Sequence, residues 1–174
     1  EQTLYRQGPK RMKIAGPEPQ AGLIERREGS RWQLVRAFCE SAQYGVRHER
    51  SVIMHDDGWW VIHDCLLANE PHDYELLFQL DPLAQGRAVW RGQQVISPEL
   101  RLVPLAGEGM ACSFEQGWVA PCYGSRHPAP RVLCRQRAAN GWFATLLTTG
   151  DAIAFAADPH TVSVAVETFG IAPC

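Results

Sequence analysis

The chain has 174 residues, a length that suits one domain, and carries a formal net charge of −2. This balance creates no strong overall field of either sign, which argues against nucleic acid as a partner. No run of 18 apolar residues occurs, so we expect no membrane span. No signal peptide is visible, but the chain begins at Glu1 without a methionine, which is typical of a processed chain or a piece of a longer protein.

Residues 1–22 are rich in glycine, proline and charge, and they predict an irregular lead-in that continues from a missing N-terminal part. From residue 23 on, short runs rich in Val, Ile, Trp, Phe and Thr are separated by turn signals such as Asn140-Gly141. With a strand roughly every ten residues and no alternation with helices, the pattern predicts an all-β fold. We expect one antiparallel β-sandwich over 23–174, with little or no helix. The best helical candidate, Trp32 to Ala42, also fits a strand.

The six cysteines are widely spaced and include no CxxC pair, so a structural zinc knuckle is not expected. They could form three disulfides in an oxidising compartment. We favour buried free thiols instead, because unpaired cysteine packs as a small hydrophobe.

Four of the six histidines lie in Arg47–Tyr74, which reads RHERSVIMHDDGWWVIHDCLLANEPHDY. A two-residue turn at Asp57-Gly58 would make this stretch a β-hairpin with Ser51 opposite Asp64. That register places His48 and Asp64 on opposite faces of the sheet. The hairpin then offers no obvious pair of zinc ligands, and no Ser-His-Asp arrangement.

His48 and His72 lie near the ends of the expected strands, where they stay free to meet a ligand from elsewhere. The one metal alternative is therefore a zinc site of His48, Asp64 and His72. The sequence contains no GxSxG elbow, no Walker motif and no dinucleotide-binding glycine motif. We assign no catalytic residue and no cofactor to this segment.

The densest basic stretch spans residues 126–137 and could bind an anionic polymer, although such runs are more often solvated faces. Tryptophans could stack on sugar rings, although they more often pack in the core. The candidate substrate contacts are Arg126, His127, Arg131 and Trp59.

The order of residues resembles the C-terminal β-sandwich of the heparinase II/III-like polysaccharide lyases. HERSVIMHDDGWWVIHDCLL followed by PHDYELLFQLDP is similar to that family's H-x-R strand, turn, W-x-V-x-D strand, histidine loop and strand ending in L-x-P. The segments EQTLYRQGPKRM and GWVAPCYGSRHPAP also resemble family segments. The matching positions of the first pattern are His48, Arg50, Trp60, Ile62, Asp64, His72, Phe78, Leu80 and Pro82.

The resemblance implies β-elimination on a uronate-containing polysaccharide, with a base that removes the C5 proton and groups that neutralise the carboxylate. In the family these groups lie in an N-terminal α/α toroid and in an HxHxD segment at the start of the sandwich. This chain has no HxHxD, so no catalytic or metal-binding role is carried over, and zinc is expected only in a full-length parent.

The resemblance thus implies a non-catalytic domain that supports the toroid of the same protein and closes one side of the substrate cleft. The expected partner is an acidic bacterial polysaccharide, and the expected location is the periplasm or cell envelope. Three alternatives stay open. One is a metal-dependent enzyme that uses His48, Asp64 and His72. A stand-alone carbohydrate-binding module would expose clustered tryptophans, and a structural interaction domain would expose a large apolar face.

Overall fold

The computed structural model describes residues 5–7, 9, 12–14, 16–41 and 44–171. Within these ranges every strand pairing is antiparallel, and the helical content is one 3₁₀ turn, so the all-β prediction is confirmed. The elements are β1 (Tyr5–Gln7), β2 (Met12–Ile14), β3 (Gln20–Glu28), β4 (Trp32–Ser41), β5 (Val46–His55), β6 (Trp59–Gln79), η1 (Pro82–Ala84), β7 (Val89–Arg91), β8 (Gln94–Ile96), β9 (Arg101–Ala106), β10 (Ala111–Val119), β11 (His127–Thr148), β12 (Phe155–Ala157), β13 (Thr161–Val164) and β14 (Glu167–Gly170).

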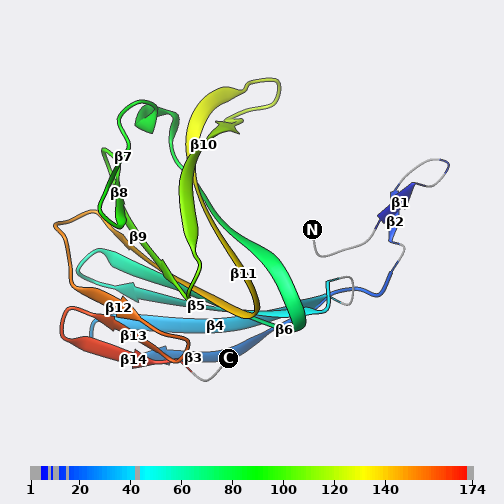
Figure 1. The fold of residues 1–174 in the computed structure, drawn as a ribbon, viewed down its shortest axis with the longest axis horizontal. Coiled ribbons are helices and arrows are strands. Elements are labelled where there is room, and N and C mark those ends of the chain that lie inside the picture. The colour runs from blue at the N-terminus through cyan, green and yellow to red at the C-terminus, as the bar shows by residue number, and fades with distance from the viewer. Residues whose placement is uncertain (1–4, 8, 10–11, 15, 42–43, 172–174) are drawn as a thin grey trace.

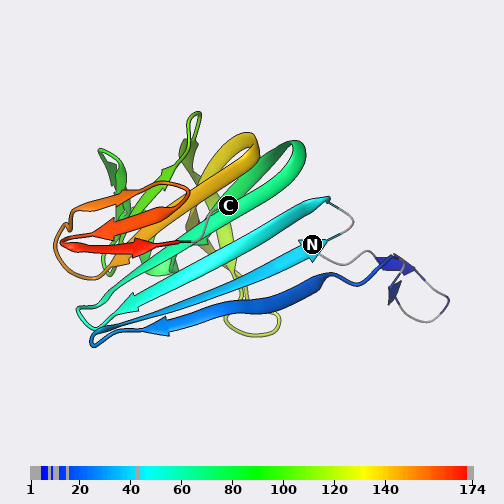
Figure 2. The same ribbon diagram turned by 90° about the horizontal axis from the view of Figure 1, so that it is seen from below.

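One large sheet forms the body of the domain, in the order β3-β4-β5-β6-β11-β9-β8-β7, and β10 pairs with β11 off this path. A second sheet of three strands, β12-β13-β14, lies on one face of the large sheet (Figures 1 and 2). Strands β7 to β10 lie on the opposite side, where β6 and β11 curve upward in Figure 1. Sheet on sheet is the arrangement of a β-sandwich, as predicted.

Two apolar clusters hold these layers together, one on each face of the large sheet. The first fills the space under the small sheet and the second lies inside the curve of β6 and β11, because side chains along each strand alternate between the faces. The first comprises Leu34, Ile53, Trp59, Val61, Leu146, Val162, Val164, Phe169 and Ile171. The second comprises Tyr74, Leu76, Leu80, Ala84, Val95, Leu102, Val132, Cys134 and Phe143.

The turn between β5 and β6 differs from the sequence-based prediction by one residue. Residues 56–58 form a three-residue loop, so His55 pairs with Trp59, and Gly58 takes a φ of 79° that favours glycine. A shift of one residue moves every side chain of a strand to the other face. The predicted placement of Asp64 opposite Ser51 is therefore wrong. Asp64 lies opposite Arg50, on the same face of the sheet as His48.

The lead-in and the helix candidate also differ from expectation. The predicted irregular stretch 1–22 contains the β1–β2 hairpin, and β3 begins inside it at Gln20. The candidate helix at Trp32 to Ala42 is strand β4 up to Ser41, and residue 42 lies outside the described residues. Pairing with β3 and β5 on both sides decides this segment in favour of the strand.

The expectation that the cysteines are free thiols is wrong for three of them. Cys112 and Cys134 lie directly opposite each other on β10 and β11 and form a disulfide. Cys65 is also disulfide-bonded. Cys39 and Cys122 are free. Sequence spacing could not reveal the Cys112–Cys134 pair, because the register of two strands brings these residues together across 22 positions.

Candidate functional site

A buried carboxylate organises the charged groups at the middle of the β5–β6 hairpin. Asp64 is only 3% exposed, and both of its carboxylate oxygens accept hydrogen bonds. His48 Nε2 and Arg50 Nε each lie 2.6 Å from Oδ1, and the terminal nitrogen of Arg50 lies 3.1 Å from Oδ2. Burial alone would raise the pKa of Asp64, but the bonds from His48 and Arg50 outweigh burial and lower it. The carboxylate is ionised at neutral pH.

His48 and His72, the two histidines of the metal alternative, line one cavity of about 200 Å³ together with Tyr44 and Tyr74. The structure brings two of the three groups of the metal alternative together, since His48 lies 2.6 Å from Asp64. Both oxygens of Asp64 also accept hydrogen bonds from Arg50. Among the described residues, no group of three or more His, Cys, Asp or Glu side chains could hold a metal ion.

A second ionic network lies on the other face of the same sheet and was not anticipated from the sequence. Arg36, buried on β4, and Arg47 on β5 both donate to the Glu49 carboxylate, and Arg47 also donates to Glu40. Burial would raise the pKa of Glu49, but the bonds from Arg47 and Arg36 lower it. The Arg47 guanidinium also covers the Phe38 ring at 4.1 Å. The buried charges are matched, which fits a structural network.

His63 is the most buried histidine of the described chain, and it lies under the small sheet. Its Nε2–H donates to the carbonyl oxygen of Asp158 over 3.0 Å, and its ring stacks near Trp142. Burial lowers the pKa of His63, and the bond to Asp158 offsets only part of this effect. His63 is therefore held in its neutral form and binds the loop before β13 to the large sheet.

We expect the free energy of unfolding to fall as the pH is lowered from 7 to 5. The unfolded chain protonates His63 near the ordinary pKa of 6.5, whereas the folded chain resists the proton. The contribution of His63 is fully present above pH 6.5 and is lost as the pH falls through the lower folded pKa. Urea unfolding at a series of pH values measures the slope.

The matched variant for this pH dependence is His63→Gln, whose neutral amide can still donate to the Asp158 carbonyl. It should flatten the slope between pH 7 and 5. It should leave the separate loss below about pH 4, which arises from the lowered pKa values of Asp64 and Glu49. Equal slopes for the wild type and His63→Gln above pH 5 would contradict this assignment.

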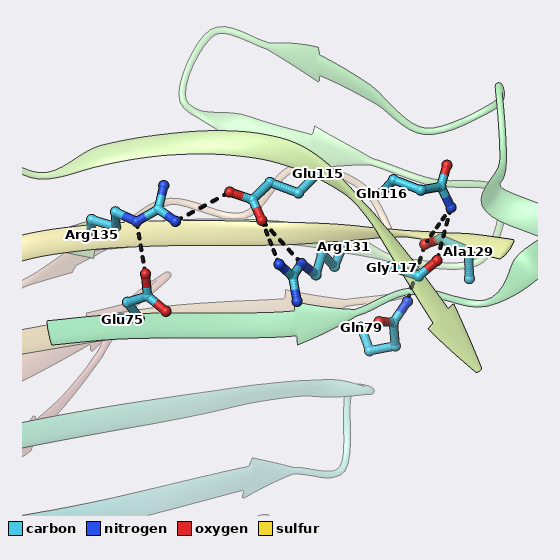
Figure 3. A network of polar contacts seen from close by, with 8 residues as sticks. All are labelled: Glu75, Gln79, Glu115, Gln116, Gly117, Ala129, Arg131 and Arg135. Atoms are coloured by element: carbon cyan, nitrogen blue, oxygen red, sulfur yellow. Dashed lines mark hydrogen bonds and ion pairs between the residues drawn. The ribbon is translucent and has the colours of Figure 1, made fainter. Parts of the chain in front are cut away.

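The predicted basic stretch is largely neutralised in the folded chain. Figure 3 shows Arg131 and Arg135 pointing at the carboxylates of Glu115 and Glu75 on the neighbouring strands. The strand register explains these pairs, because Glu115 lies opposite Arg131 and Glu75 lies opposite Arg135. Arg137 pairs in the same way with an aspartate of β6, over 2.7 Å. Arg131 therefore has a carboxylate partner already.

Arg126 and His127, the other two basic candidates, lie at the far end of the β10–β11 hairpin. The Arg126 guanidinium stacks over the ring of Trp118 at 3.8 Å, and His127 Nε2 lies 3.0 Å from the Ser125 hydroxyl. No acidic partner of Arg126 is seen among the described residues. The structure thus separates Arg126 and His127 from Arg131, and it adds Trp118, which no sequence pattern distinguished from the other tryptophans.

Trp59, the aromatic candidate, lies in the first apolar cluster rather than on the surface. It is 4% exposed, stacks on His55 at 4.5 Å and meets the edge of Phe169. Its neighbour Trp60 is 51% exposed on the opposite face of the strand. Of these two neighbouring rings, Trp60 is exposed and Trp59 is buried, so Trp59 is not placed to contact a ligand at the surface. No helix within the described ranges is long and apolar enough to cross a membrane.

The folded chain is similar in structure to several polysaccharide lyases. It superposes on heparinase III, the BT4657 gene product, with a TM-score of 0.71 at 17% sequence identity, and this match covers 87% of this chain and 27% of that one. It also superposes on heparan sulfate lyase HepC from Pedobacter heparinus with a TM-score of 0.68 at 13% identity, with the same coverage. The chain therefore spans about a quarter of the length of these proteins. At such identities the likeness shows the fold. No curated protein matches the chain.

The family model described as "Heparinase II/III-like, C-terminal" matches residues 6–171, which is nearly the whole chain. The match includes the β5–β6 hairpin with the Asp64 cluster, and the β10–β11 hairpin. The chain belongs to the heparinase II/III-like C-terminal domain family.

Proposed function

We propose that this chain is the C-terminal sandwich of a polysaccharide lyase that cleaves a uronate-containing acidic polysaccharide by β-elimination. The observation that carries the proposal is the family match over residues 6–171. The fold likeness to heparinase III and to a heparan sulfate lyase supports it.

The chemistry of the described residues supports a non-catalytic role for the domain. β-Elimination needs a base beside the C5 proton and a group that neutralises the adjacent carboxylate. The buried acids and bases of this chain are engaged with one another instead: Asp64 with Arg50 and His48, and Glu49 with two arginines. They stabilise the sheet, on which a preceding catalytic domain of the same protein would rest.

A location in the periplasm or cell envelope agrees with this role. An acidic bacterial polysaccharide is met outside the cytoplasm, and the disulfide of Cys112 and Cys134 is typical of an oxidising compartment. Zinc, if the parent uses it, would be bound by residues outside this chain.

A lyase assay on this chain and on its full-length parent tests the proposal. Both proteins are incubated with a panel of uronate polymers, and the ultraviolet absorbance of the new C4–C5 double bond is followed. We expect turnover by the parent alone. A neutral glucan serves as the substrate control, since it has no carboxylate to make the proton acidic.

Two other results would count against the proposal. Turnover by the isolated chain would place a catalytic centre within the sandwich, and the cavity with His48 and His72 would be the first place to look for it. A parent that cleaves none of the uronate polymers would refute the lyase assignment itself.

A role as a carbohydrate-binding module is the second candidate function. It is favoured by one observation, the exposed aromatic and basic side chains at the end of the β10–β11 hairpin.

A further inference from the structure

The end of the β10–β11 hairpin carries a cluster of exposed aromatic and basic side chains that the fold itself does not require. We name Trp118, Tyr123 and Arg126 the hairpin-end platform. Trp118 is 48% exposed, and the Tyr123 side chain is fully exposed. Large aromatic side chains normally bury most of their surface, so two exposed rings within six residues point to a binding surface.

The geometry of Arg126 distinguishes it from the other arginines of the hairpin. Its guanidinium lies 3.8 Å from the centre of the Trp118 ring, a cation–π contact that orients the planar group. Arg131 and Arg135 donate hydrogen bonds to the carboxylates of Glu115 and Glu75. Within the described chain, no carboxylate takes the donors of Arg126. They are available to a carboxylate or sulfate, which a guanidinium binds at two points.

The local charge favours an anion, although the whole chain is slightly acidic. The segment 119–130 reads VAPCYGSRHPAP and contains no aspartate or glutamate, while Arg126 and His127 bring basic groups. The Ser125 hydroxyl holds the His127 ring at 3.0 Å. The hairpin end is therefore a positive spot on a protein whose net charge is −2.

The backbone at this end is suited to present a preformed surface. Trp118 lies opposite Pro128, and Gly117 lies opposite Ala129, in the continuous register of β10 and β11. Two pairs further from the turn, Glu115 and Arg131 form an ion pair, and the Cys112–Cys134 disulfide links the two strands near the other end of the hairpin. A surface that is rigid before binding loses less conformational entropy on binding.

We propose that the hairpin-end platform binds a carboxylated or sulfated sugar of an acidic polysaccharide. An aromatic ring of the platform would stack on the apolar face of the sugar, and Arg126 would pair with the acidic group. The site does not include Asp64 or its partners Arg50 and His48, and it would hold the polymer on the domain. The choice of ligand rests on the proposed function, whereas the position of the site rests on the geometry.

The test is a binding titration of the 174-residue chain with heparan sulfate oligosaccharides, followed by calorimetry at low and at physiological salt. Neutral dextran is the control polymer. We expect binding of heparan sulfate that weakens with salt, because exposed charges are screened, and no binding of dextran. The variants Arg126→Ala and Trp118→Ala should each weaken binding by about tenfold, the loss of one good contact. Arg126→Lys should recover only part of it, since lysine lacks the planar fork.

Matched controls separate the platform from a general effect of charge or of exposed tryptophan. Arg91 is an exposed arginine with no ion pair among the described residues, and Trp60 is as exposed as Trp118 but lies on another strand. Arg91→Ala and Trp60→Ala should leave affinity unchanged. Urea midpoints equal to wild type would show that all variants are folded.

The proposal is overturned if the wild-type chain does not bind heparan sulfate at low salt, or if Arg91→Ala weakens binding as much as Arg126→Ala. Such a failure is distinct from a failure of the proposed function, which the lyase assay on the parent reports. A parent that cleaves while the chain does not bind leaves the lyase assignment intact and removes the platform. A chain that binds while the parent does not cleave supports the platform and refutes the lyase assignment.

Discussion

Replacing Asp64 with asparagine is expected to lower the free energy of unfolding by about 2 kcal/mol, because it removes a buried carboxylate that accepts hydrogen bonds from Arg50 and His48. Asparagine keeps the shape of the side chain but not its charge. Its amide group would point N–H donors at the donors of Arg50 and His48, which now meet two accepting oxygens. Half-exposed Arg50 can regain water, which keeps the loss from being larger. Urea unfolding at pH 7 measures the difference.

The control for Asp64 is Asp73→Asn on the same strand. Asp73 also pairs with an arginine, Arg137, at 2.7 Å, but both side chains are mostly exposed, and ion pairs of this kind stabilise little. We expect Asp73→Asn to lie close to wild type. If the two variants lose the same stability, the Asp64 cluster is not the central support of the hairpin that the structure indicates.

Removing the disulfide with Cys112→Ser and Cys134→Ser is expected to lower the free energy of unfolding by about 3 kcal/mol, from the loop entropy that a link across 22 positions removes from the unfolded chain. The comparison is the pair Cys39→Ser and Cys122→Ser, whose thiols are free. A reductant should destabilise the wild type at least as much as the first pair of substitutions, because it also reduces the disulfide of Cys65. A first pair as stable as the second would contradict the expectation.

The sequence was sufficient to predict the fold class, because strand runs and turn signals are local properties. Turn signals such as Asp57-Gly58 placed the hairpin correctly. They did not fix its register, since a two-residue and a three-residue loop share the same Asp-Gly signal. That single residue decided whether Asp64 lies on the same face of the sheet as His48. The predicted register therefore placed Asp64 and His48 on opposite faces of the sheet, although the two side chains are hydrogen-bonded in the structure.

Strand register also explains which arginines of the basic stretch are already paired with a carboxylate. Arg131 and Arg135 look available along the chain, because their partners Glu115 and Glu75 lie 16 and 60 positions away and meet them only across strands. Arg126 keeps its donors because nothing acidic lies opposite it. One feature could have been predicted from the sequence. The turn segment that contains Arg126 has no carboxylate that could pair with it.

The length of β6 and β11 affects how the domain unfolds. These two strands pair along their length, from Trp59 opposite Thr148 to Gln79 opposite Arg131. They contribute side chains to both apolar clusters. Because both strands serve both faces, the large sheet should unfold cooperatively, as one foldon. The small sheet of β12–β14 shares no strand with the large sheet. It is attached through side-chain packing and individual hydrogen bonds, such as the one that His63 donates. This architecture therefore permits one partial unfolding step, in which the small sheet detaches. That step would expose the large-sheet side chains of the first cluster to water, while the rest of the domain stays folded.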